Sequence, residues 1–151
     1  RLVGSEMCIR DRCLDIAAEG ENLSLARLEA LHRAKTGALI EASLMIGAYC
    51  AEVEPDNPRL ALLRTFGQRI GLAFQIVDDI LDVTESSQTL GKPAGSDDAL
   101  NKNTFPKLMG LEGARQRAEA LLTQALTLLE EADLATDLLK NLAERSVKRR
   151  H

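Results

Sequence analysis

The chain contains 151 residues, of which 45% are hydrophobic and only 3% aromatic, and its formal net charge at pH 7 is −4. An acidic chain of this kind is not a nucleic-acid binder of the basic-patch type. Leucine and alanine supply most of the apolar residues, and both favour helices over strands. The composition therefore predicts an all-α protein that is long enough for one domain with a sizeable core.

The cysteines and the apolar stretches indicate the cellular compartment in which the protein is expected. Cys8, Cys13 and Cys50 form no Cys-x-x-Cys pair, and an odd, scattered set favours a reducing, cytoplasmic location over a disulfide framework. No stretch reaches the roughly 18 uncharged apolar residues of a membrane-spanning helix. Residues 1–12 carry charges where a signal peptide has its apolar core. We therefore expect neither a membrane span nor an export signal.

The first clear hydrophobic period begins after residue 12. Residues 1–12 show no such period, so we interpret them as a truncated or non-native start and leave them out of functional reasoning. Ser24 is a good N-cap for a helix whose apolar residues recur over 25–31 and 39–48, with a bend expected near Gly37. Two prolines within residues 54–58 predict the turn that ends this helix.

Three further helices are predicted towards the C-terminus. The first covers about residues 59–84 and is followed by a long polar stretch, 85–103, which we interpret as a functional or disordered loop. Thr104 is expected to cap a short turn that precedes an amphipathic helix over about 111–132. The last helix starts at Thr136 and ends in a basic tail, whose cations suit a helix C-terminus.

The helix predicted over 59–84 carries a stripe of polar residues on one face. The stripe follows helical spacing and consists of Gln75, Asp78, Asp79 and Asp82. A solvated helix face is the ordinary explanation for such a run. However, no lysine or arginine lies between residues 70 and 84, and neighbouring like charges, with acids near a helix C-terminus, destabilise a helix. A sequence that keeps such destabilising charges on one helix usually does so for function.

A hard cation would explain the stripe. Asp78 and Asp82 lie one turn apart and can offer oxygen ligands to Mg²⁺, which prefers a few carboxylates together with waters and substrate phosphates. The stripe contains no histidine or cysteine, so zinc is not favoured. Cations for a phosphate-bearing substrate are available at Lys35, Lys92 and Lys102. Each lysine alone is ordinarily just solvated, and it is their occurrence with the stripe that favours a phosphate site.

Four motifs resemble those of the trans-polyprenyl diphosphate synthases. FQIVDDILD, followed by LGKPAGSD and NKNTFP, resembles the second aspartate-rich motif and the following loop of that family, and HRAKTGALI resembles its Lys-Thr-Gly motif. The overall pattern over residues 13–151 is most similar to bacterial farnesyl diphosphate synthases. The resemblance implies an all-helical isoprenoid synthase fold, usually a homodimer, that condenses an allylic diphosphate with isopentenyl diphosphate to give farnesyl or geranylgeranyl diphosphate.

The resemblance also implies roles for single residues. Asp78 and Asp82 would be Mg²⁺ ligands, and Asp79 would assist the same site. The substrate residues would be Lys35 and Lys92 for the allylic diphosphate, Thr36 and Gln75 beside the forming carbocation, and Lys102 as a further loop lysine. The implied chemistry is electrostatic, with Lewis-acid help to the leaving group and no protein nucleophile. The basic tail could help to close this site, although capping of its helix is the expected role.

The family's earlier aspartate-rich motif and its upstream basic residues have no counterpart in these 151 residues. We therefore expect residues 13–151 to be the C-terminal half of a synthase domain that is inactive alone. Two apolar stripes are expected to be exposed and to promote self-association: Leu25, Leu28 and Leu31, and Ile70, Phe74 and Val77. Two alternatives stay open: a terpene cyclase, which the few aromatic residues disfavour, and a non-catalytic helical partner subunit.

Overall fold

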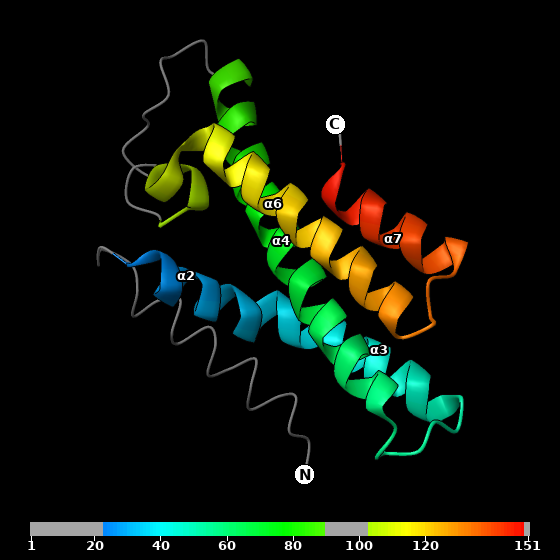
Figure 1. Cartoon of the computed structure of the whole chain (residues 1–151). Coiled ribbons are helices and arrows are strands. Elements are labelled where there is room, and N and C mark those ends of the chain that lie inside the picture. Colours follow the sequence, from blue (N-terminus) through cyan, green and yellow to red (C-terminus); the bar gives the residue numbers. More distant parts are fainter. Residues whose placement is uncertain (1–22, 90–102, 150–151) are drawn as a thin grey trace.

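A computed structural model of the chain describes residues 23–89 and 103–149 (Figure 1). All regular structure in these residues is helical and none of it is a strand, which confirms the predicted all-α class. The elements are α2 (Leu25–His32), the π-helix η1 (Arg33–Gly37), α3 (Ala38–Cys50), α4 (Pro58–Thr89), α6 (Phe105–Glu131) and α7 (Asp137–Val147). No helix within the described ranges is long and apolar enough to cross a membrane. Residues 1–12, interpreted above as a non-native start, lie outside the described residues.

The three predicted helix starts are confirmed. Ser24, Thr104 and Thr136 have extended backbones, and each side-chain oxygen accepts a hydrogen bond from the amide three residues later. The short turn after Thr104 and the long helix behind it form one element, α6, which is interrupted at Gly110. Gly110 has a φ of 77°, a conformation that residues with a side chain rarely adopt. Helix α4 continues to Thr89, five residues beyond its predicted end.

The bend expected near Gly37 is a π-helical turn instead. The turn η1 joins α2 to α3 without a break, and the resulting rod crosses α4 (Figure 1). At the crossing, a Cβ atom on Gly71 would lie only 2.5 Å from the Gly37 Cα atom. Glycine is required there because the two backbones are in contact. This contact holds the Lys35-Thr36-Gly37 segment one helical turn from Gln75.

The core forms where α4 packs lengthwise against α6, with α7 and the α2–α3 rod on either side (Figure 1). The apolar stripes expected to be exposed are mostly covered: Leu28 is 1% exposed, Ile70 is 4% and Val77 is 7%, whereas Leu31 and Phe74 are half-buried and Leu25 is 37% exposed. The expectation holds for Leu25 and was wrong for Leu28, Ile70 and Val77, because Leu28 packs into the core and α6 and α7 cover α4. Self-association through these particular residues is therefore not expected.

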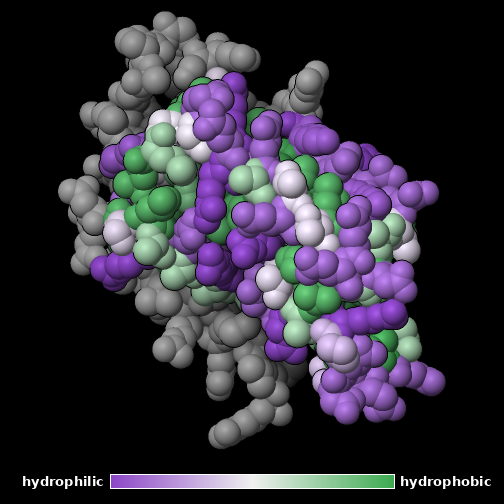
Figure 2. Space-filling model, in the orientation of Figure 1, coloured by the Kyte–Doolittle hydropathy of each residue, from purple (hydrophilic) through white to green (hydrophobic). Residues whose placement is uncertain are grey.

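The exposed apolar side chains lie elsewhere, chiefly on α3 and α7. Leu39 is 69% exposed and Leu142 is 53% exposed, and both line an apolar groove of about 320 Å³ between α3, α4 and α7. On the face drawn in Figure 2, hydrophobic surface is interspersed among hydrophilic side chains. The hydrophobic groups that remain at the surface are thus distributed over several elements.

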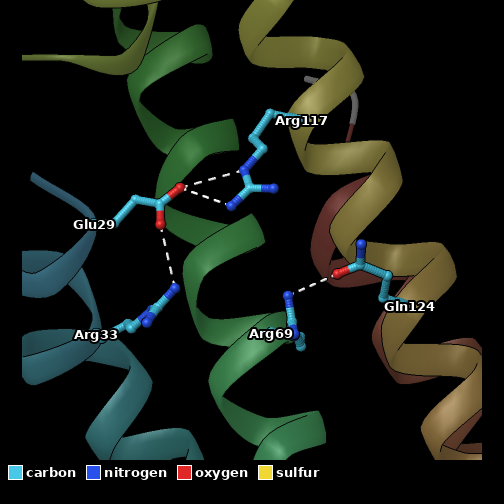
Figure 3. A network of polar contacts seen from close by, with 5 residues as sticks. All are labelled: Glu29, Arg33, Arg69, Arg117 and Gln124. Carbon is cyan, nitrogen blue, oxygen red and sulfur yellow. Dashed lines mark hydrogen bonds and ion pairs between the residues drawn. The ribbon is translucent and has the colours of Figure 1, made fainter. Parts of the chain in front are cut away.

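Polar contacts tie α6 to α2 and to α4 (Figure 3). Glu29 Oε1 accepts hydrogen bonds from Arg117 Nη2 at 2.8 Å and Nε at 3.3 Å, while its other oxygen pairs with Arg33 at 3.2 Å. Two turns further along α6, Gln124 Oε1 accepts a hydrogen bond from Arg69 Nη1 at 2.7 Å. A carboxylate shared by two guanidinium groups has most of its hydrogen-bonding capacity used. These contacts hold α2, and the π-helical turn η1 that follows it in the chain, against the α4–α6 pair.

Candidate active site

The polar stripe of α4 lies along the side of the helix opposite to its apolar residues. Gln75, Asp78 and Asp79 are partly exposed and Asp82 is exposed, whereas the intervening Ile76, Val77 and Ile80 are buried. The predicted separation of a polar face from an apolar face is therefore confirmed. The ligand and substrate roles assigned to the polar residues stay predictions.

Asp78 is held by two donors, one of which comes from the far end of the chain. Gln75 Nε2 donates to Asp78 Oδ2 at 3.2 Å, and Arg149 Nη2 donates to Asp78 Oδ1 at 2.6 Å. The guanidinium also lies over the Phe74 ring, 3.8 Å from its centre. The absence of a cation between residues 70 and 84 therefore did not mean that Asp78 lacks a basic partner. Arg149 reaches Asp78 from the end of α7.

Asp79 faces the start of α6. Its Oδ2 atom accepts a hydrogen bond from the Phe105 backbone amide at 3.0 Å and lies 3.9 Å from His32 Nε2. A carboxylate at this position satisfies one of the unpaired amides of the first helical turn and faces the positive end of the helix dipole. Asp79 thus fixes the beginning of α6 against α4, a role that the sequence did not predict.

His32 joins these groups together. It is buried, its Nδ1 atom donates to Gln75 Oε1 at 3.1 Å, and its ring stacks on Phe105 with centroids 5.5 Å apart. Because Gln75 accepts from His32 on one side and donates to Asp78 on the other, both ends of its amide group are oriented. Sequence reasoning missed His32, although a histidine next to the apolar stripe of its helix, one turn before Lys35, was a usable signal.

Of the three lysines proposed to bind the substrate, the structure describes only the backbone of Lys35. Lys35 and Thr36 belong to η1, which the Gly37–Gly71 contact holds against α4, and Thr36 is partly buried. The side chain of Lys35 lies outside the described part of the structure. Lys92 and Lys102 also lie outside the described residues. The structure therefore brings the Lys-Thr-Gly segment to α4, next to the stripe.

The chemistry of the stripe fits Mg²⁺. Asp82 is exposed and makes no ion pair with another residue that the structure describes, and Asp78 lies one turn before it. Within the described ranges, no group of three ligating side chains lies close enough to hold a metal by itself. Mg²⁺ tolerates such a partial set because it keeps waters and binds substrate phosphates alongside one or two carboxylates. Asp78 and Asp82 are the residues that would hold it.

The sequence is similar to those of known proteins. A model of the polyprenyl synthetase family matches residues 5–143. The chain belongs to this family. It is 44% identical over 141 residues to farnesyl diphosphate synthase of Escherichia coli, covering 91% of the chain and 47% of that protein. It is 42% identical over 134 residues to chloroplastic geranylgeranyl pyrophosphate synthase of Catharanthus roseus, covering 88% of the chain and 37% of that protein.

Solved structures of the polyprenyl synthetase family share the fold. The geranyltransferase of Helicobacter pylori, crystallised with magnesium and isoprenyl diphosphate, matches with a TM-score of 0.72 and 35% sequence identity. The match covers 93% of this chain and 46% of that one. The all-helical isoprenyl diphosphate synthase fold is therefore established for this chain, which spans about half the length, or less, of the relatives it matches.

Proposed function

We propose that this chain forms the allylic-diphosphate side of a prenyltransferase. The enzyme joins an allylic diphosphate to isopentenyl diphosphate with Mg²⁺ and makes a short-chain product of the farnesyl or geranylgeranyl type. The observation that carries the proposal is the aspartate pair, Asp78 and Asp82, which lie one turn apart on the helix that the Lys-Thr-Gly segment contacts at Gly71. The 44% identity to a farnesyl diphosphate synthase supports the choice of reaction.

Each described residue of the site contributes orientation or charge. Asp78 and Asp82 hold Mg²⁺, which when bound supplies Lewis-acid charge that helps the diphosphate to leave. Gln75 orients Asp78, and His32 orients Gln75. Thr36 and Gln75 offer fixed dipoles beside the forming carbocation, and such pre-oriented dipoles stabilise charge without having to reorganise. Asp79 acts indirectly, because it anchors the start of α6.

Lysines complete the proposed site as fixed positive charges. Lys35, Lys92 and Lys102 would bind diphosphate oxygens as ammonium point charges. No side chain attacks the substrate, so the protein needs no nucleophile. Residues 13–151 are proposed to be the C-terminal half of the synthase domain, in a full-length protein that forms a homodimer.

The first test is prenyl transfer itself. The sequence contains a single Asp-Asp-x-x-Asp motif, and positioning two substrates accounts for about 7–11 kcal/mol of such a reaction when the geometry is complete. We expect the 151-residue chain to be helical by circular dichroism and to give no product from labelled isopentenyl diphosphate, an allylic diphosphate and Mg²⁺. A complete protein that carries residues 13–151 should give product, which chelation of Mg²⁺ abolishes.

The outcomes separate the alternatives. Robust product from the 151-residue chain would contradict the expectation that residues 13–151 are inactive alone. A complete protein that is folded and inactive alone, yet accelerates an active synthase chain, would identify a non-catalytic partner subunit. A cyclic hydrocarbon product in place of a longer diphosphate would identify a terpene cyclase.

The proposed lysines are tested by removing their charge in the complete protein. Lys35→Gln or Lys92→Gln should raise the KM for the allylic diphosphate roughly tenfold or more, since a hydrogen bond to a charged group contributes about 1.5–3 kcal/mol. Lys140→Gln is the matched control, because Lys140 lies on α7 and pairs with Glu130 at 3.5 Å. Kinetics equal to those of the control, with an unchanged circular dichroism spectrum, would show that both lysines are merely solvated.

A further inference from the structure

Arg149 is held beside the aspartate stripe by several independent contacts. Its Nη2 atom donates to Asp78 Oδ1 at 2.6 Å and to the Phe74 carbonyl at 3.4 Å. Its Nε atom donates to the Ser146 carbonyl at 3.1 Å, and the guanidinium plane covers the Phe74 ring. Arg149 follows α7 by two residues, so these contacts fix the end of the last helix onto α4.

The charge balance of the stripe depends on this arginine. Within the described residues, Arg149 is the cation that pairs with Asp78, while the neighbouring Lys148 pairs with Glu144 on its own helix at 3.5 Å. The stripe brings three carboxylates together on one helix face, and their mutual repulsion destabilises the helix. A guanidinium on Asp78 relieves part of that repulsion when no metal is present.

We propose that Arg149 is an exchangeable counter-ion of Asp78: it pairs with this carboxylate in the metal-free protein and leaves it when Mg²⁺ binds. This inference rests on the proposed function, because it assumes that Asp78 is a metal ligand. Arg149 and a divalent cation cannot both be close to Asp78 without repelling one another. The face of Phe74 and the Ser146 carbonyl keep the released guanidinium near the site. The end of α7 therefore responds to the state of the metal site.

The consequence is a competition that can be measured without any turnover. Mg²⁺ binding is measured by calorimetry on the purified chain and on its Arg149→Gln, Arg149→Lys, Arg145→Gln and Asp82→Asn variants. Arg149→Gln should bind Mg²⁺ about threefold to tenfold more tightly than the parent, since an ion pair no longer has to break and a repelling charge is gone. Arg149→Lys keeps the charge and should fall between the two.

Arg145→Gln is the matched control. Arg145 is exposed in the last turn of α7, four residues before Arg149. Its replacement gives the same change in net charge and should leave Mg²⁺ affinity within about twofold of the parent, because exposed charges are largely screened. In the parent, the ¹⁵N resonance of Arg149 Nε should shift on addition of Mg²⁺. It should not shift in Asp82→Asn.

The possible results distinguish this inference from the proposed function. Suppose that Asp82→Asn abolishes Mg²⁺ binding but Arg149→Gln leaves the affinity unchanged or lowers it. This result would overturn the proposed exchange and would still support the metal site. Absence of any Mg²⁺ binding that depends on Asp82 would overturn the exchange, whereas the proposed function is tested separately by prenyl transfer in the complete protein. Equal tightening in Arg145→Gln and Arg149→Gln would show a general charge effect and would also overturn the exchange.

Discussion

Asp78→Ala and Asp82→Ala should each lower the turnover of the complete prenyltransferase by about 100-fold or more, which corresponds to roughly 2.7 kcal/mol of transition-state stabilisation. Both changes remove an oxygen ligand from the proposed Mg²⁺ site. Asp82 is exposed and unpaired with any other described residue, so its replacement should hardly change stability. The Asp78–Arg149 ion pair is partly solvated, and its loss should cost at most about 1 kcal/mol.

Asp79→Ala should show the opposite pattern. Its carboxylate accepts the Phe105 amide at the start of α6, and loss of such a helix cap costs about 0.5–2 kcal/mol. We therefore expect the Asp79 variant to have the lowest free energy of unfolding of the three and the smallest loss of turnover. Steady-state rates across Mg²⁺ concentrations, together with urea unfolding, provide the measurements. Equal, mild losses of turnover in all three variants would support the solvated-face interpretation.

Gly71→Ala should be strongly destabilising although it adds a single methyl group inside a helix. The new Cβ atom would lie 2.5 Å from the Gly37 Cα atom and 3.1 Å from the Gly37 nitrogen, and backbone atoms cannot rotate away as a side chain can. Overpacking of this kind costs about 1–3 kcal/mol. In the complete protein, the KM for the allylic diphosphate should also rise, because η1 carries Lys35 and Thr36 and would be pushed away from Gln75.

Gly47→Ala is the control for this substitution. A Cβ atom at Gly47, an exposed position of α3, would meet nothing within 4 Å. Replacing glycine by alanine inside a helix then stabilises the protein by about 0.5–1 kcal/mol. Urea denaturation of the two variants should give changes of opposite sign. Two variants with the same stabilisation would mean that η1 and α4 do not touch at Gly71.

Long-range contacts account for what the sequence did not reveal about the site. His32 bonds to Gln75, 43 positions away, and Arg149 bonds to Asp78, 71 positions away. Neither pair follows a helical spacing, so a search for periodic patterns cannot detect it. The basic tail was interpreted first as a helix cap, with closure of the site as the alternative, because only its neighbours in the chain were visible.

By contrast, interactions between residues close in the sequence were sufficient to predict the helices and the polar face of α4. Ser24, Thr104 and Thr136 cap helices through their own side chains, and the spacing of Gln75, Asp78, Asp79 and Asp82 alone puts them on one face. Tertiary structure decided which of these aspartates is engaged: Asp79 with the start of α6, Asp78 with Arg149, and Asp82 with no described partner. The physical reason is that caps and helical periods act within a few residues, whereas the partners of a carboxylate depend on which distant helices pack beside it.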